Sequence, residues 1–193
     1  MQPMIKFISN QEAQIAKEDF DEKILYARMF FDNEDYETFD VDITDWSKER
    51  YIKQWKHAVD YSIKNREISL FFKDFRVSTP YNIMRSFVYI LIPEECVDIE
   101  KWNIQDDENI KPQDFYIVEQ MIYLTTDVNN LCSEKVLNII KDDDNIYIPV
   151  YYVNPDKLDW FYPYIGHMFS NINIQTIWHK KISKKYLESI LKM

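Results

Sequence analysis

The chain of 193 residues contains one glycine, Gly166. A phosphate-binding P-loop, a dinucleotide-binding G-x-G-x-x-G turn and a G-x-S-x-G nucleophile elbow each need several glycines. The sequence therefore excludes all three sites. Turns with positive φ must use Asn or Asp instead, as at Asn129-Asn130 or Asp144-Asn145. Because 46% of the residues are hydrophobic, we expect one globular domain over residues 1–193, with residues 1–20 forming a loose arm or a short helix.

The charge of the chain is strongly negative. The formal net charge is −10, and residues 1–45 hold twelve acidic against four basic side chains. Nucleic acids and anionic membranes repel such a surface, so we expect the chain to bind neither directly. A basic protein partner fits this charge better.

Cysteine and histidine give no sign of a cofactor or a metal. The two cysteines, Cys96 and Cys132, predict thiols in a reducing compartment, and whether they are close in space is left open. The three histidines, His57, His167 and His179, lack metal-ligand spacing. A nucleophilic pair of Cys132 with His167 or His179 is the only Cys/His alternative. No apolar run is long enough to span a bilayer and no signal peptide is evident, so we expect a cytoplasmic protein without a cofactor.

Hydrophobic periodicity predicts an α+β fold. Apolar and polar residues alternate over Thr38–Ile43, which predicts a strand that forms a hairpin with a strand at Ile24–Phe31. One apolar face predicts a helix over Ser47–Asn65. Further expected strands are Ile68–Phe75, Ser86–Ile92, Phe115–Leu124, Ile146–Val153 and Ile172–Trp178; further expected helices cover 133–141, 155–164 and 183–191, and a loop covers 94–111. Because the elements do not alternate strictly, we expect a mostly antiparallel or mixed sheet with helices packed on one side.

Acidic residues are concentrated in the predicted hairpin. The hairpin carries Asp32, Glu34, Asp35, Glu37, Asp40 and Asp42, with no Lys or Arg between Arg28 and Lys48. We predict that these carboxylates are exposed and bind a basic partner, with Asp142, Asp143 and Asp144 as the second choice. A solvated acidic face without a partner is the simpler alternative.

Aromatic residues are also dense around Trp160. The run from Trp160 to Tyr164, together with Tyr147 to Tyr152, could line a ligand groove, although core packing is the commoner use of such rings. A small enzyme or ligand-binding domain is therefore one alternative function. An acidic protein that mimics DNA and inhibits a nuclease is another.

The segment from Asp45 to Trp55 is more specific. It reads D-W-S-K-E-R-Y-I-K-Q-W and follows the predicted strand Phe39–Ile43. With Tyr116 and Gln120 in the later strand, it resembles immunity proteins of bacterial contact-dependent growth inhibition, which are polymorphic toxin systems. The resemblance implies a non-catalytic inhibitor that binds and neutralises a cognate toxin domain, such as a nuclease, in the cytosol, and that is a monomer or weak dimer alone.

The same segment also has a structural interpretation. Asp45 or Ser47 can cap the helix, and Trp46 can pack against its first turn. Tyr51 and Trp55 lie on the predicted apolar face. The aromatic residues of the segment are therefore expected to serve the fold.

Overall fold

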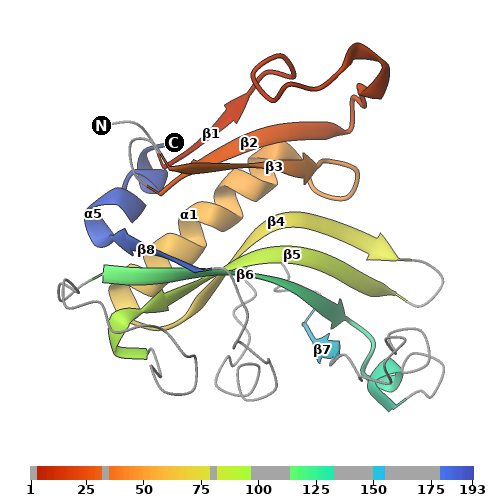
Figure 1. Cartoon of the computed structure of the whole chain (residues 1–193). Helices are drawn as coiled ribbons and strands as arrows, with labels where there is room; N and C mark the ends of the chain where they lie inside the picture. The colour runs from red at the N-terminus through yellow and green to blue at the C-terminus, as the bar shows by residue number, and fades with distance from the viewer. Residues whose placement is uncertain (1–3, 32–34, 79–81, 97–113, 133–149, 155–178) are drawn as a thin grey trace.

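The computed structural model describes residues 4–31, 35–78, 82–96, 114–132, 150–154 and 179–193 (Figure 1). The architecture is α+β, as predicted, with two sheets and one long helix. The first sheet has the strand order β1-β2-β3; the second has the order β4-β5-β6-β7, with β8 beside β6. The elements are β1 (Ile5–Ile8), β2 (Ile24–Phe30), β3 (Tyr36–Asp42), α1 (Lys48–Asn65), β4 (Ser69–Ser78), β5 (Ile83–Pro93), β6 (Asp114–Thr125), β7 (Val150–Tyr152), β8 (His179–Ser183) and α5 (Lys184–Leu187).

The predicted hairpin is confirmed. β2 and β3 pair antiparallel, with Phe30 opposite Tyr36. Phe39 and Val41 are buried while Asp40 is exposed, as the alternation predicts. Asp42 breaks the pattern, because it is only 8% exposed. The expectation that Asp42 lies on the exposed face is therefore wrong.

Within residues 1–20, Lys17–Asp19 form a short 3-10 helix. Ile5–Ile8, in contrast, form neither a loose arm nor a helix. These residues form β1, which pairs antiparallel with β2 and places Ile5 opposite Met29. Met4 and Ile5 are fully buried. The strand is too short to show a period of its own, and pairing with β2 stabilises it.

Helix α1 begins and ends with identifiable caps. The Ser47 hydroxyl accepts a hydrogen bond from the Arg50 N–H at 3.3 Å, which makes Ser47 the cap among the candidates. Arg66 ends the helix in the left-handed conformation, with φ 54°, a position that usually holds glycine. Trp55 stacks on Phe7 of β1 and on Phe71 of β4, with centroid distances of 5.6 and 5.0 Å. Helix α1 therefore contributes to one core shared by both sheets (Figure 1).

The second sheet is mixed, as predicted. β4, β5, β6 and β8 pair antiparallel, and β7 pairs parallel with β6. The predicted last helix is replaced by α5 and a short 3-10 helix, Ile190–Lys192. Glu94–Cys96 forms another short 3-10 helix where a loop was expected. The predictions for 133–141, 155–164 and 172–178, and the rest of the 94–111 loop, lie outside the described residues.

Candidate functional site: a charged groove between the sheets

A groove of about 340 Å³ lies where β3 of the first sheet faces β4, β5 and β6 of the second. We call it the junction groove. Its lining combines four carboxylates, three cations and two phenylalanines with one threonine: Glu37, Thr38, Phe39, Asp40, Lys73, Asp74, Arg76, Arg85, Phe87 and Glu119. The acidic hairpin therefore forms one wall of the groove.

Lys73 is buried beneath the groove. The β4–β5 register shifts between Phe72 and Asp74, so Lys73 is the extra residue of a β-bulge, a feature that redirects a side chain. The Lys73 side chain is 6% exposed, and its Nζ lies 2.5 Å from one carboxylate oxygen of Glu37 and one of Glu119. Lys73 thus connects β3 to β6.

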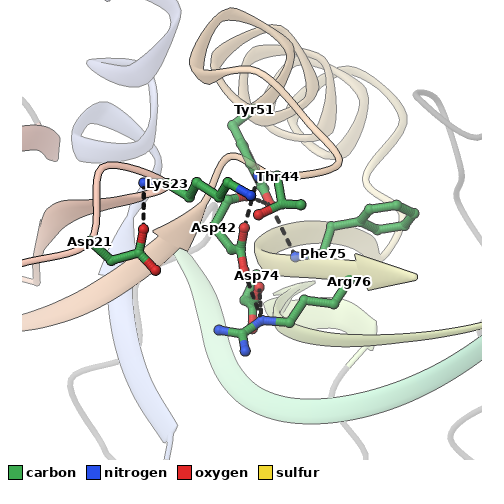
Figure 2. A network of polar contacts seen from close by, with 8 residues as sticks. All are labelled: Asp21, Lys23, Asp42, Thr44, Tyr51, Asp74, Phe75 and Arg76. Atoms are coloured by element: carbon green, nitrogen blue, oxygen red, sulfur yellow. Dashed lines mark hydrogen bonds and ion pairs between the residues drawn. The ribbon is translucent and has the colours of Figure 1, made fainter. Parts of the chain in front are cut away.

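Arg76 forms a second charged cluster at the end of β3 (Figure 2). Its Nε lies 3.2 Å from an Asp42 oxygen and 3.0 Å from an Asp74 oxygen. The Asp42 carboxylate also accepts the Thr44 N–H at 2.8 Å. Burial raises the pKa of Asp74 above its ordinary value, although Arg76 opposes the shift. These bonds explain why Asp42 is buried.

The Tyr51 hydroxyl ties this cluster to the helix. It donates to the Asp42 carbonyl at 2.8 Å and accepts from the Phe75 N–H at 3.0 Å (Figure 2). Burial raises the pKa of Tyr51, so the hydroxyl remains protonated and able to donate. One side chain of α1 thus joins the end of β3 to β4.

Two charged side chains of the groove are exposed and could contact a ligand. Asp40 and Arg85 are both exposed, and no ion pair is found for either within the part of the chain that the structure describes. Arg85 lies opposite Arg76 in the β4–β5 register. The ring of Phe87 is 37% exposed beside them. The groove can therefore offer a carboxylate, a guanidinium and an apolar ring to a ligand.

The aromatic residues of the Asp45–Trp55 segment pack in the core, as their structural interpretation predicts. Trp46, Tyr51, Gln54 and Trp55 are at most 1% exposed, and Trp46 stacks on Phe75 at 4.5 Å. Asp45 is exposed and does not cap the helix. In β6, Tyr116 is buried, whereas the side chain of Gln120 lies outside the described part of the structure.

The absence of Lys and Arg between Arg28 and Lys48 suggests hairpin carboxylates without a local counter-charge, but the fold brings cations to them. Lysines from distant strands approach them: Lys180 lies 2.5 Å from Asp35, and Lys73 lies 2.5 Å from Glu37. The expectation failed because it considered only neighbours in sequence. Asp32, Glu34, Asp142, Asp143, Asp144 and Trp160 lie outside the described residues. Binding of a partner by the hairpin stays a prediction.

The groove residues on β4, β5 and β6 were not predicted as site residues. One signal was present, because the consecutive charges Lys73 and Asp74 interrupt an apolar strand pattern. Two adjacent charges cannot both lie on the solvent face of a regular strand. Such a pair therefore indicates a bulge or buried ion pairs.

The described residues were also compared with the expectations for metal ligands, membrane-spanning helices and cysteines. Among the residues that the structure describes, no group of three or more His, Cys, Asp or Glu is placed to hold a metal ion. Over the same residues, no helix combines the length and apolarity needed to cross a membrane. Cys96 is a half-buried free thiol, and burial raises its pKa; the Cys132 side chain lies outside the described residues.

Comparison with known proteins gives one structural likeness. No family model matches the chain, and no curated protein matches it. Among solved structures, the chain is similar to the CdiA-CT/CdiI toxin and immunity complex from Enterobacter cloacae. The identity is 11%, the alignment covers 88% of this chain and 88% of that chain, and the TM-score is 0.42.

Proposed function

We propose that this chain is an immunity protein that binds a basic toxin domain in the cytoplasm and blocks its active cleft. The observation that carries the proposal is the segment Asp45–Trp55, whose sequence resembles immunity proteins of contact-dependent growth inhibition. The segment follows β3, which ends at Asp42, and contains the capped start of α1 and its buried aromatic residues. The inhibitor acts by occlusion, without catalysis, and is a monomer or weak dimer alone.

The charge of the molecule supports a basic partner. A toxin domain that acts on nucleic acid needs a cationic cleft, and an acidic inhibitor accelerates association with such a cleft by electrostatic steering. The net charge of −10 provides that field. The nuclease activity of the toxin is part of this proposal.

We place the docking surface at the junction groove and the acidic hairpin. Lys73 is held between two carboxylates, and so is Arg76. Each cluster therefore keeps one uncompensated negative charge. The charges of Asp40 and Arg85 cancel each other. The eight charged side chains of this surface therefore keep a net negative charge, although Lys73, Arg76 and Arg85 are cations. The hairpin residues Asp32 and Glu34 belong to the same proposal, and Asp142 to Asp144 stay the second choice for the docking surface.

Co-purification with the toxin domain encoded beside this gene tests the proposal. We expect a stoichiometric complex in which toxin activity is abolished, and an association rate that falls steeply with added salt. The control is a toxin domain from an unrelated system, which should neither bind nor be inhibited. A cognate toxin domain that remains fully active in the presence of excess purified chain would contradict the proposal.

A further inference from the structure

Strand β4 is the outer strand of the second sheet, with β5 on its other side. The outer edge of such a strand presents backbone N–H and C=O groups that could pair with another strand. In this chain several of those groups are bonded to side chains of α1. The donors and acceptors belong to Tyr51, Gln54 and Trp55, which are the residues of the Y-x-x-Q-W part of the sequence segment.

Gln54 bonds to β4 as a peptide group of a neighbouring strand would. Its Nε2 donates to the Leu70 carbonyl at 2.7 Å, and its Oε1 accepts from the Phe72 N–H at 3.2 Å. In a parallel ladder, one residue likewise bonds to a carbonyl and to an N–H two residues further along the neighbouring strand. The carboxamide of Gln54 has the same donor and acceptor as a peptide. Because Gln54 is 1% exposed, water does not compete for these bonds.

Trp55 and Tyr51 extend the contact along the same edge. The Trp55 Nε1–H donates to the Phe72 carbonyl at 2.6 Å, and the Tyr51 hydroxyl accepts the Phe75 N–H at 3.0 Å. Positions i, i+3 and i+4 share one face of a helix. That face therefore meets the outward backbone groups of β4 from Leu70 to Phe75.

We propose that Tyr51, Gln54 and Trp55 form a surrogate strand that closes the edge of β4 to strand addition. The surrogate strand occupies the place where a strand of a partner, or of a second copy of this chain, would pair. It also prevents β3 from continuing the second sheet, so the two sheets stay separate and the junction groove lies between them. The inference does not depend on the proposed function.

Backbone amide hydrogen exchange, resolved by NMR, tests the proposal on the purified chain. In the wild type, we expect the Phe72 and Phe75 amides to be protected although none of the strands that the structure describes covers this edge. Gln54→Leu should accelerate exchange at Phe72 roughly tenfold relative to Phe71, because one buried hydrogen bond is lost. The Phe71 amide is the internal control, because alternation directs it toward β5.

Tyr51→Phe is the matched variant, since it removes a single oxygen atom. It should accelerate exchange at Phe75 by a similar factor and leave Phe72 unchanged. If Gln54→Leu does not fold, this variant carries the test alone. The proposal is overturned if the wild-type Phe72 and Phe75 amides exchange as fast as exposed amides. It is also overturned if Tyr51→Phe accelerates all amides of β4 equally.

Discussion

The Lys73 ammonium lies 2.5 Å from the Glu37 carboxylate, so the two sheets are joined by an ion pair at a β-bulge. Glu119 binds the same ammonium from β6. The acidic hairpin is thereby fixed relative to β4 and β6. The position of the proposed docking surface therefore depends on a buried cation that β4 contributes.

Replacing Lys73 should destabilise the fold strongly. Lys73→Met keeps most of the length of the side chain but leaves Glu37 and Glu119 facing each other without a cation. We expect a loss of about 3 kcal/mol in the free energy of unfolding, measured by urea denaturation. Lys64→Met removes a lysine from an exposed pair with Asp60, and should cost less than about 1 kcal/mol. Equal losses for the two variants would show that the buried pair has no special role.

Removing the Trp55 ring should destabilise the core. Trp55 is fully buried and stacks on Phe7 and Phe71. Trp55→Ala should lower the free energy of unfolding by about 3–5 kcal/mol, measured by thermal and urea denaturation. Lys53→Ala, at an exposed position of the same helix, should change it by less than about 0.5 kcal/mol. An unchanged melting temperature with loss of partner binding would instead place Trp55 in an interface.

The raised pKa of Asp74 predicts an unusual pH dependence. In the unfolded chain this carboxyl titrates near its ordinary value of 3.8, and burial raises its pKa in the folded state. The folded state therefore binds the proton more tightly, so the contribution of Asp74 to stability is lost as the pH rises above 3.8 through the folded pKa. Asp74→Asn removes this titration. The unfolding free energy of the variant minus that of the wild type should therefore increase with pH across this window.

Glu95 supplies a control of the opposite sign. A hydrogen bond from Arg66 is the main reason why the pKa of Glu95 lies below its ordinary value of 4.5. Its contribution to stability is present above pH 4.5 and is lost as the pH falls through the lowered pKa. For Glu95→Gln, the variant minus wild-type difference should therefore decrease as the pH rises. Parallel pH profiles for the two variants would contradict at least one of the two assignments.

Asp40 should affect the rate of association with the toxin domain. It is exposed on the β3 wall of the groove. Asp40→Lys should slow association about tenfold at low salt, with a smaller effect at high salt and little change in stability. Glu18→Lys makes the same charge change at an exposed position away from the groove lining. Equal slowing by both would assign the effect to net charge and remove the groove from the proposed interface.

Phe87 should affect the rate of dissociation. Its ring is 37% exposed at the groove, so truncation leaves little new cavity. Phe87→Ala should keep the free energy of unfolding within about 1 kcal/mol of the wild type. We expect it to weaken toxin binding by roughly 1–2 kcal/mol through faster dissociation, measured by surface plasmon resonance. Phe20→Ala, at a more exposed ring outside the groove lining, should have no such effect.

Elements whose signal is local were predictable from the sequence. Helix α1 carries its own cap at Ser47 and its own apolar period, and the β2–β3 hairpin shows alternation in β3 after an acidic turn. β1 was missed because Ile5–Ile8 is stabilised by pairing rather than by its own pattern. The α+β class followed because it depends only on the order and type of such elements.

The candidate site was predictable only in part. Glu37 and Asp40 were identified, since charge density is visible along the chain. Their surroundings depend on tertiary contacts: Lys73 reaches Glu37 through a bulge, and Arg76 holds Asp42 inside the protein. Hydrophobic periodicity indicates which face of a strand is buried, but it does not indicate which cation of another strand contacts that face. The pairing of charges in the site is therefore set by tertiary contacts.

The three side chains of the surrogate strand bond to main-chain atoms of β4: the Leu70 carbonyl, both backbone groups of Phe72 and the Phe75 N–H. Every amino acid except proline supplies these atoms. Substitutions along β4 can therefore alter the wall of the groove without breaking the attachment of the helix. The amino acids of β4 that line the groove can therefore diverge with those of a binding partner, while the main-chain bonds to α1 keep the fold unchanged.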